Sequence, residues 1–176
     1  MKKNLVKAEK IEFYAPRTKK HKISKGKSGL VVCERCDAVY YKKSWHRDLR
    51  NYKNLKENLP ISFSLCPACE MIKNRQFEGE IIIKNVPIKI KDGLINLVKT
   101  FSKRAFERDP MDRLIAVKET KEGIRITLTE NQLAVKLAKK IKQTFKKVEM
   151  KISYFPAPSD VVYIRLTYDQ QPTTDN

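Results

Sequence analysis

Two short motifs, Cys33-Glu34-Arg35-Cys36 and Cys66-Pro67-Ala68-Cys69, contain all four cysteines of the chain, with residues 37–65 between them. A C-x2-C turn brings two thiolates to about 3.5–4 Å of each other, the edge of a tetrahedron around a metal with bonds of roughly 2.3 Å. Two such turns complete a four-thiolate site with no open position, as in structural rather than catalytic zinc sites. The sequence therefore predicts structural Zn²⁺ bound by Cys33, Cys36, Cys66 and Cys69.

Other uses of paired cysteines fit less well. Disulfides need an oxidising compartment, and the N-terminus has basic residues but no apolar segment of a secretory signal. A redox pair is normally a single C-x-x-C, and the spacer is unlike common ferredoxin spacings. His21 or His46 could replace one ligand, although four thiolates already complete the tetrahedron. We therefore expect a cytoplasmic protein whose thiols stay reduced and hold metal.

The charge of the chain points to a polyanionic partner. Lys and Arg number 38 against 20 Asp and Glu, a net charge of +18. This excess predicts attraction to nucleic acid, with an anionic membrane surface as the alternative. No apolar run is long enough to span a bilayer. The chain also lacks HExxH, P-loop and zinc-deaminase patterns, so we expect no enzymatic activity.

The sequence divides into four parts. Residues 1–29 hold ten Lys or Arg and few apolar residues, which predicts a flexible basic arm that contacts phosphates. Residues 30–79 form a small zinc-binding module with the four cysteines, residues 80–168 a second domain, and residues 169–176 a polar tail. The sequence therefore predicts two folded parts, residues 30–79 and 80–168, between a basic arm and a polar tail.

Within the zinc-binding module, the apolar runs 30–32 and 39–41 predict a β-hairpin around the first motif. Apolar residues recur at helical spacing over 45–59, which predicts a helix capped by Ser44 and ended by Pro60. Trp45 lies on its apolar stripe and is expected to anchor the helix on the cysteines, with base stacking as the alternative role. A second helix is expected directly after Cys69, since a helix that opens at a cysteine motif is typical of a treble clef. We therefore expect a zinc-ribbon or treble-clef-like module.

Patterns after residue 79 alternate between strands and helices. The order is strand 80–83, helix capped by Asp92, strands 114–118 and 124–128, a helix opened by a Thr129 capping box, and closing strands 151–155 and 161–166. This β-α-β-β-α-β order with an extra closing strand predicts a ferredoxin-like α+β domain, an antiparallel sheet covered by two helices. The RNP1 signature is absent, so base stacking on this sheet is not expected.

Several basic positions are candidates for phosphate contacts. The second C-terminal helix has a polar face of lysines without acids, where a solvated face normally mixes both signs. The basic arm and the predicted spacer helix supply the others. The candidate nucleic-acid-binding residues are Lys19, Lys20, Lys22, Lys42, Lys43, Arg47, Arg50, Lys53, Lys136, Lys139, Lys140 and Lys147.

The chain resembles a known family. Its paired motifs, with Cys66-Pro67-Ala68-Cys69 leading to Phe77-Glu78-Gly79-Glu80, are similar to the N-terminal zinc region of the ribosomal large-subunit export adaptors, named for nonsense-mediated decay protein three. The stretches Glu107-Arg108-Asp109-Pro110-Met111-Asp112-Arg113-Leu114-Ile115 and Thr127-Leu128-Thr129-Glu130-Asn131-Gln132-Leu133-Ala134 resemble the small prokaryotic relatives. The likeness covers roughly residues 30–168, and only the cysteine motifs are specific.

The resemblance implies a zinc-bound protein of the ribosome or rRNA, with the four cysteines as ligands. The chain lacks the downstream OB-like and SH3-like domains and the export signals of the eukaryotic adaptor, so a role in nuclear export does not transfer.

We therefore expect a zinc-stabilised, non-enzymatic RNA-binding protein that associates with rRNA or the large ribosomal subunit in assembly, quality control or translation. A DNA-binding or transcription-linked protein, or an interaction module for acidic proteins, is the alternative, because charge alone does not separate these partners. The bound RNA, the specificity and the oligomeric state are left open by the sequence.

Overall fold

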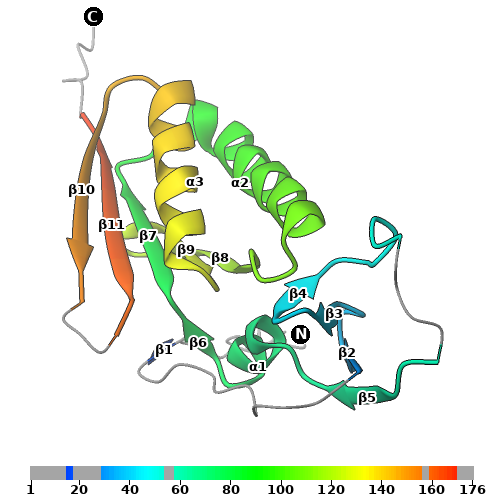
Figure 1. The fold of residues 1–176 in the computed structure, drawn as a ribbon. Coiled ribbons are helices and arrows are strands. Elements are labelled where there is room, and N and C mark those ends of the chain that lie inside the picture. Colours follow the sequence, from blue (N-terminus) through cyan, green and yellow to red (C-terminus); the bar gives the residue numbers. More distant parts are fainter. Residues whose placement is uncertain (1–14, 18–28, 54–57, 156–158, 170–176) are drawn as a thin grey trace, which may run out of the picture.

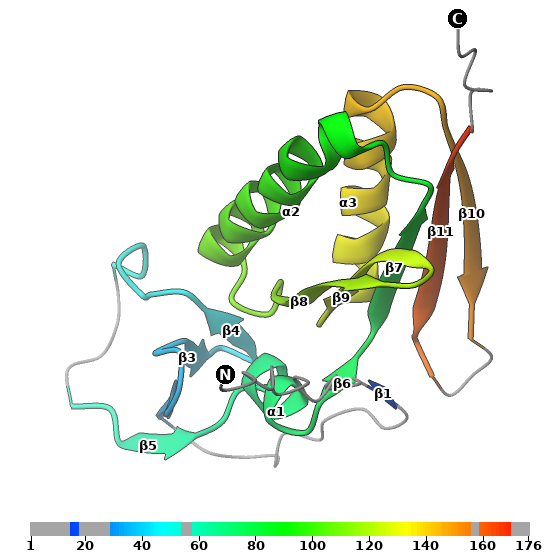
Figure 2. The same ribbon diagram turned by 180° about the vertical axis from the view of Figure 1, so that it is seen from behind.

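The computed structural model of the protein describes residues 15–17, 29–53, 58–155 and 159–169. It shows a cysteine module, from Leu30 to Lys73, beside a larger C-terminal unit, from Gly79 to Tyr168 (Figures 1 and 2). Among the described residues, no helix has the length and hydropathy that a bilayer span requires.

The cysteine module is a four-stranded sheet followed by a short helix. Its elements are β2 (Leu30–Cys33), β3 (Val39–Tyr41), β4 (Ser44–His46), β5 (Ile61–Ser64) and α1 (Pro67–Lys73). The strand order is β4-β3-β2-β5, with β5 parallel to β2 and the other pairs antiparallel. The hairpin around the first motif and the helix after the second were both predicted, and both are confirmed.

The helix expected over residues 45–59 is wrong. Residues 44–46 instead form strand β4, which pairs with β3 through a two-residue turn, Lys42-Lys43. Residues 47–53 are turns and irregular chain, and 54–57 lie outside the described residues. Trp45 still packs against the cysteines, as predicted, but from a strand. Pairing with β3 satisfies the backbone groups that a helix would otherwise satisfy internally.

The C-terminal unit is a five-stranded sheet with two helices side by side over one face (Figures 1 and 2), so the predicted α+β class is confirmed. The sheet order is β10-β11-β7-β9-β8. The bounds are β7 (Gly79–Lys84), α2 (Ile88–Arg108), β8 (Leu114–Thr120), β9 (Gly123–Leu128), α3 (Asn131–Thr144), β10 (Val148–Tyr154) and β11 (Val162–Tyr168).

The expectation of an antiparallel sheet is wrong for one pair of strands. β11 runs parallel to β7, with Ile164 opposite Ile81, while β10 pairs antiparallel with β11 at the edge. The additional strand reverses the chain direction once more before the last strand enters the sheet. β11 therefore runs parallel to β7, and it lies between β10 and β7 in the sheet.

A single core holds this unit together. The buried side of the sheet, with residues such as Ile81 and Leu166, packs against buried residues of α2 and α3, including Val98 and Leu137. Gly79 allows α3 to approach β7 closely, because a Cβ at this position would lie 2.5 Å from the Cβ of Ala134. The helix is therefore seated directly on the first strand of the sheet.

Both predicted helix caps differ from the structure. Asp92 lies inside α2, which begins four residues earlier, directly after Pro87. The Thr129 side chain caps no helix: it donates to the Met111 carbonyl oxygen and accepts from the Arg113 amide. These long-range partners replace the local capping bonds, and α3 begins with Glu130 as its N-cap residue. The helix ends at Thr144, so the predicted helical positions Phe145 and Val148 lie beyond it.

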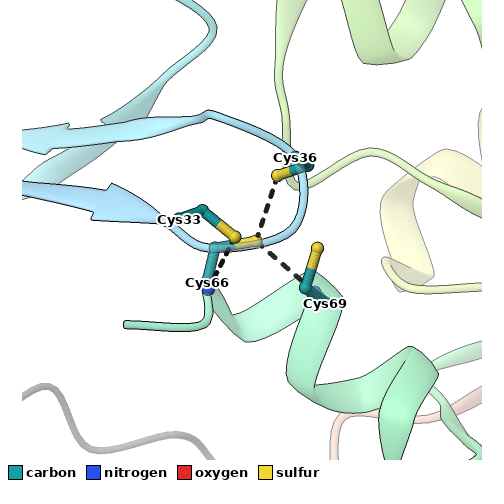
Figure 3. A group of neighbouring side chains, drawn as sticks. All are labelled: Cys33, Cys36, Cys66 and Cys69. Carbon is teal, nitrogen blue, oxygen red and sulfur yellow. Dashed lines mark hydrogen bonds between the residues drawn. The ribbon is translucent and has the colours of Figure 1, made fainter. Parts of the chain in front are cut away.

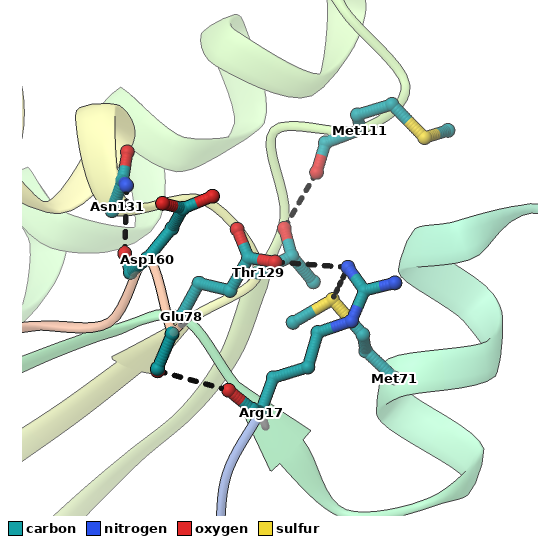
Figure 4. Close-up of polar contacts among 8 residues, drawn as sticks. Arg17, Met71, Glu78, Met111, Thr129, Asn131 and Asp160 are labelled. Atoms are coloured by element: carbon teal, nitrogen blue, oxygen red, sulfur yellow. Dashed lines mark hydrogen bonds and ion pairs between the residues drawn. The ribbon is translucent and has the colours of Figure 1, made fainter. Parts of the chain in front are cut away.

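Residues 15–17 correct the prediction of a wholly flexible arm. Ala15–Pro16 forms β1, which pairs in parallel with β6 (Gln76–Phe77). The Arg17 guanidinium donates to Glu78 Oε1 at 2.9 Å, and only 11% and 13% of the two side chains are exposed (Figure 4). Ser159 Oγ donates to the Arg17 carbonyl oxygen at 3.1 Å. Residues 1–14 and 18–28 of the arm lie outside the described residues.

Candidate functional site

The four cysteines converge at one point between the β2–β3 turn and the start of α1 (Figure 3). All four Sγ atoms lie within 4.8 Å of one another, and those of Cys36 and Cys66 are 3.7 Å apart. A tetrahedral site with bonds of roughly 2.3 Å has edges of about 3.8 Å. Cys33, Cys66 and Cys69 are buried and Cys36 is half-buried. The predicted ligand set is therefore assembled, and it could hold a metal ion.

Backbone donors help to hold the sulfurs. The Cys66 amide donates to Cys33 Sγ at 3.3 Å, and the Cys69 amide donates to Cys66 Sγ at 3.4 Å. Cys66 is thus the N-cap residue of α1, where the helix dipole favours negative charge. The hydrogen bond from the Cys66 thiol lowers the pKa of Cys69 to about 5, and Arg113 contributes to the same shift. Burial raises the pKa of Cys36.

Residues from both units surround the cysteines. Trp45 of the module and Met111 of the α2–β8 loop pack against the cluster. The guanidinium groups of Arg47 and Arg113 lie over the Phe106 ring, 4.7 and 4.2 Å from its centroid. Arg113 Nη1 is also 3.9 Å from Cys69 Sγ. The cysteine site is therefore part of the junction between the module and α2.

Of the two histidines, His46 lies within the described residues and is not part of this set of ligands. His46 Nε2 lies 3.0 Å from the Tyr41 carbonyl oxygen and 3.2 Å from the Tyr52 hydroxyl, and it is absent from the group of potential ligands. His21 lies outside the described residues. The donor set is sulfur alone among the residues that the structure places.

The predicted lysine face is exposed along α3. Lys136, Lys139 and Lys140 are exposed, whereas Lys147 lies past the end of the helix with a φ of 65°. None of the four forms an ion pair with a carboxylate in the described ranges. A cluster of cations without paired acids remains available to an external anion.

A broad groove of about 890 Å³ runs along α2 and reaches Lys140 of α3. Its apolar wall is formed by Leu97 and Phe101, and its cations are Arg104, Arg108 and Lys140, with Glu107 as the one acid in the lining. Arg104 and Arg108 were not among the predicted phosphate contacts. The signal was present, because Arg104 and Arg108 are spaced i,i+4 and so lie on one helical face.

The other predicted phosphate contacts differ in their partners and their exposure. Arg47 is a junction residue, since it also donates to the Cys36 carbonyl oxygen at 2.9 Å. Arg50 forms an ion pair with Asp48 at 2.6 Å. Lys42 and Lys43, in the β3–β4 turn, and Lys53, after β4, are exposed. Lys19, Lys20 and Lys22 lie outside the described residues. The basic candidates that the structure describes therefore form two separate groups, one on the helices and one on the module.

The chain has no match among known family models, and no curated protein matches it. The resemblance to the export adaptors therefore stays a prediction. Any assignment of function rests on the geometry of the cysteines and the basic surfaces.

Proposed function

We propose that this chain is a zinc-stabilised, non-enzymatic protein that binds RNA, most specifically rRNA of the large ribosomal subunit. The observation that carries the proposal is a set of exposed cations on α2 and α3: α3 contains no acidic residue, and Arg104, Arg108 and Lys140 line the groove. Such a surface neutralises phosphates without reading sequence. The excess of 38 basic over 20 acidic residues supports a partner of the same kind.

The donor set supports zinc as the metal. Four cysteine sulfurs within 4.8 Å suit a tetrahedral site, and soft thiolates select Zn²⁺ over Mg²⁺ or Ca²⁺. Four protein ligands leave no position for a substrate or a water, so the metal would organise the module rather than do chemistry. Zinc bound here would fix the β2–β3 turn against α1 and, through Met111 and Arg113, against the C-terminal unit.

We further infer that the C-terminal unit is a variant of the ferredoxin-like layout. Four of its strands have the order β11-β7-β9-β8, which corresponds to the strand order expected for that layout, and β10 is added at the edge. The parallel pairing of β11 with β7 is the departure from it. Both helices lie on one face of the sheet, and the groove cations Arg104, Arg108 and Lys140 are exposed.

Sedimentation of a cell lysate through a sucrose gradient tests the ribosomal part of the proposal. We expect this protein to co-migrate with the large subunit at about 50 mM salt and to leave it at high salt. With six to ten phosphate contacts, affinity should fall by about 10³-fold or more between 50 and 200 mM salt. Migration at the top of the gradient under both conditions would contradict ribosome association.

A pair of charge-matched variants tests where RNA binds. The triple change of Lys136, Lys139 and Lys140 to Gln should weaken binding of purified rRNA and reduce the slope of log K against log salt by about 2–3. The control changes Lys73, Lys121 and Lys151 to Gln, three exposed lysines elsewhere, and so alters the net charge equally. Equal losses in both variants would show that only net charge matters. Stronger binding of duplex DNA than of rRNA would favour the DNA-binding alternative.

A further inference from the structure

The outer face of the sheet in the cysteine module is largely apolar, and no described residue buries its Ile61 and Phe63 side chains. In β2 the buried residues Val31 and Cys33 point towards the cysteine site, so Leu30 and Val32 point outward. In β5, Ile61 and Phe63 point outward and are 60% and 66% exposed. These two are among the largest exposed apolar side chains of the described residues.

The strand register aligns the outward side chains in two rows. One row contains His46, Val39, Val32 and Phe63, and the other contains Tyr41, Leu30 and Ile61. Tyr52 extends the face, because its ring lies 5.3 Å from Tyr41 and 5.1 Å from His46. We call this surface, formed by Leu30, Val32, Val39, Tyr41, His46, Tyr52, Ile61 and Phe63, the aromatic face.

Cations rim the aromatic face. Lys42 Nζ lies 5.6 Å from the Tyr41 ring and 5.7 Å from the Tyr52 ring, and Lys43 and Lys53 are exposed beside it. None of these three lysines forms an ion pair with a described carboxylate. Apolar rings bordered by free cations suit a ligand that has flat apolar groups and a negatively charged backbone.

The β3–β4 turn places its two lysines at an energetic cost. Lys42 and Lys43 have φ of 47° and 67°, the left-handed conformation at both central positions of a tight hairpin. Such turns favour Asn-Gly, because a side chain at positive φ is unfavourable. Residues held in unfavourable conformations are often functional. Two lysines at these positions are explained if their charges contact a ligand.

We propose that the aromatic face binds single-stranded RNA, whose bases stack on Phe63, Tyr41 and Tyr52 while its phosphates contact Lys42, Lys43 and Lys53. This inference rests on the proposed RNA binding and adds a second contact surface, which reads unpaired bases rather than charge alone. The free lysines favour a polyanion over an apolar protein segment. Stacking tolerates any base, so the face would prefer single strands without preferring a sequence.

Fluorescence titration of the full-length, zinc-loaded protein tests the inference. The probe is an RNA of about 12 nucleotides, a length within the range that single-strand binding domains cover, with 2-aminopurine at its centre. Phe63→Leu keeps an apolar side chain but removes the ring. We expect it to weaken binding of the single strand by about 5- to 150-fold, the equivalent of one stacked base, and to reduce quenching of 2-aminopurine.

Two controls separate stacking from other effects. Tyr154→Leu removes another aromatic residue, 69% exposed on the C-terminal unit, and should leave binding unchanged. Duplex RNA should bind wild type and Phe63→Leu equally, because its bases are already stacked. Zinc content and circular dichroism verify that Phe63→Leu is folded, as expected for an exposed position.

The outcomes distinguish this inference from the proposed function. If Phe63→Leu binds the single strand like wild type while the triple lysine variant of α3 does not, the aromatic face is overturned and the RNA-binding proposal stands. If wild type binds no RNA, both fail. If sedimentation equilibrium shows a dimer that Phe63→Asp dissociates, the face contacts a second copy of the chain, and the inference is overturned.

A turn variant adds an independent readout. Replacing Lys42 by Asn and Lys43 by Gly should raise the thermal midpoint, because the new residues suit the positive φ angles. The same variant should bind single-stranded RNA less tightly, with a salt slope lower by about 1–2. Unchanged affinity in a stabilised variant would remove the lysines from the proposed surface.

Discussion

The cysteine module and the C-terminal unit differ most in what fills their interiors. The core of the C-terminal unit has 18 buried residues, nearly all aliphatic, drawn from β7, β9, β10 and β11 and from α2 and α3. The cluster around the cysteines has five buried residues, three cysteines and two alanines, and the larger apolar side chains buried elsewhere in the described part of the module are Val31 and Met71. The module therefore buries little apolar surface that would favour folding in the absence of a metal.

This difference indicates that the two units draw their stability from different sources. Aliphatic burial stabilises the C-terminal unit in any buffer that keeps the protein soluble. A small module with so few buried aliphatic residues resembles the metal-dependent domains in which binding and folding are one equilibrium.

Removal of the metal should have the largest effect. Chelation, or Cys66→Ser, should unfold the module, since thiolate coordination of zinc contributes about 10 kcal/mol in small zinc domains. Hydrogen exchange should then show loss of protection over residues 30–73 and retention over residues 79–168. Uniform loss across both ranges would show that the two units fold as one.

A core truncation should produce the reverse pattern. Leu137 is fully buried between α3 and the sheet, so Leu137→Ala should lower the free energy of unfolding of the C-terminal unit by about 2–5 kcal/mol. The metal content should stay unchanged. The matched control is Lys139→Ala on the exposed side of the same helix, with an expected change within about 0.5 kcal/mol. Urea unfolding and metal analysis measure the two properties separately.

Glu130 should make the C-terminal unit sensitive to pH. Burial raises the pKa of this carboxyl to about 7, with Glu78, Asp112 and Asp109 adding to the shift and Arg17 opposing it. The folded state therefore holds the proton more tightly than the unfolded state does. The associated stability is fully present below the ordinary pKa of 4.5 and is lost as the pH rises through about 7.

Unfolding of the metal-loaded protein in urea, from about pH 5.5 to about pH 8.5, measures this effect. Wild type should lose about 1–3 kcal/mol over that range, and Glu130→Gln should flatten the curve. Glu149→Gln, a change at an exposed carboxyl on β10, should leave the curve unchanged. A curve that keeps its shape in Glu130→Gln would assign the pH dependence to another group.

The smallest expected effect lies at the junction. Phe106→Leu keeps an apolar side chain but removes the ring that Arg47 and Arg113 contact, and each exposed cation–π contact contributes about 0.5–1 kcal/mol. A double-mutant cycle with Arg47→Met should give a coupling energy in that range. Coupling near zero would mean that the two units touch here without stabilising each other.

The sequence predicted the features that depend on local patterns. The cysteine spacing identified the four residues that converge, and alternation and helical periodicity located α3 and most strands of the C-terminal unit. The helix over 45–59 failed because the apolar spacing suited a helix, while the turn that creates β4 is Lys42-Lys43 rather than a recognisable Asn-Gly. A hairpin whose turn lacks the usual Asn-Gly or Asp-Gly residues is not recognised from the sequence pattern.

Features that depend on long-range contacts were not predictable in the same way. Thr129 has the pattern of a capping box, but the partners of its side chain are Met111 and Arg113. The parallel pairing of β11 with β7 joins strands that are far apart in sequence, and no local pattern encodes their direction. The aromatic face was missed although Ile61-Ser62-Phe63-Ser64 alternates, because that signal predicts a strand without showing that its apolar side stays exposed.

The parallel pairing of β1 with β6 has a consequence for how the module responds to metal loss. Ala15 lies opposite Gln76, and Arg17 is held by Glu78, so the chain enters and leaves the module at one place beside the C-terminal unit. The chain between them is a loop whose ends are joined by the β1–β6 pairing and the Arg17–Glu78 ion pair, and we expect these contacts to persist when the module loses its metal. Closure lowers the entropy of the unfolded loop, so the cysteines of an unfolded module remain concentrated near one another. The module could then bind metal again quickly, because its four cysteines do not have to diffuse together from an open chain.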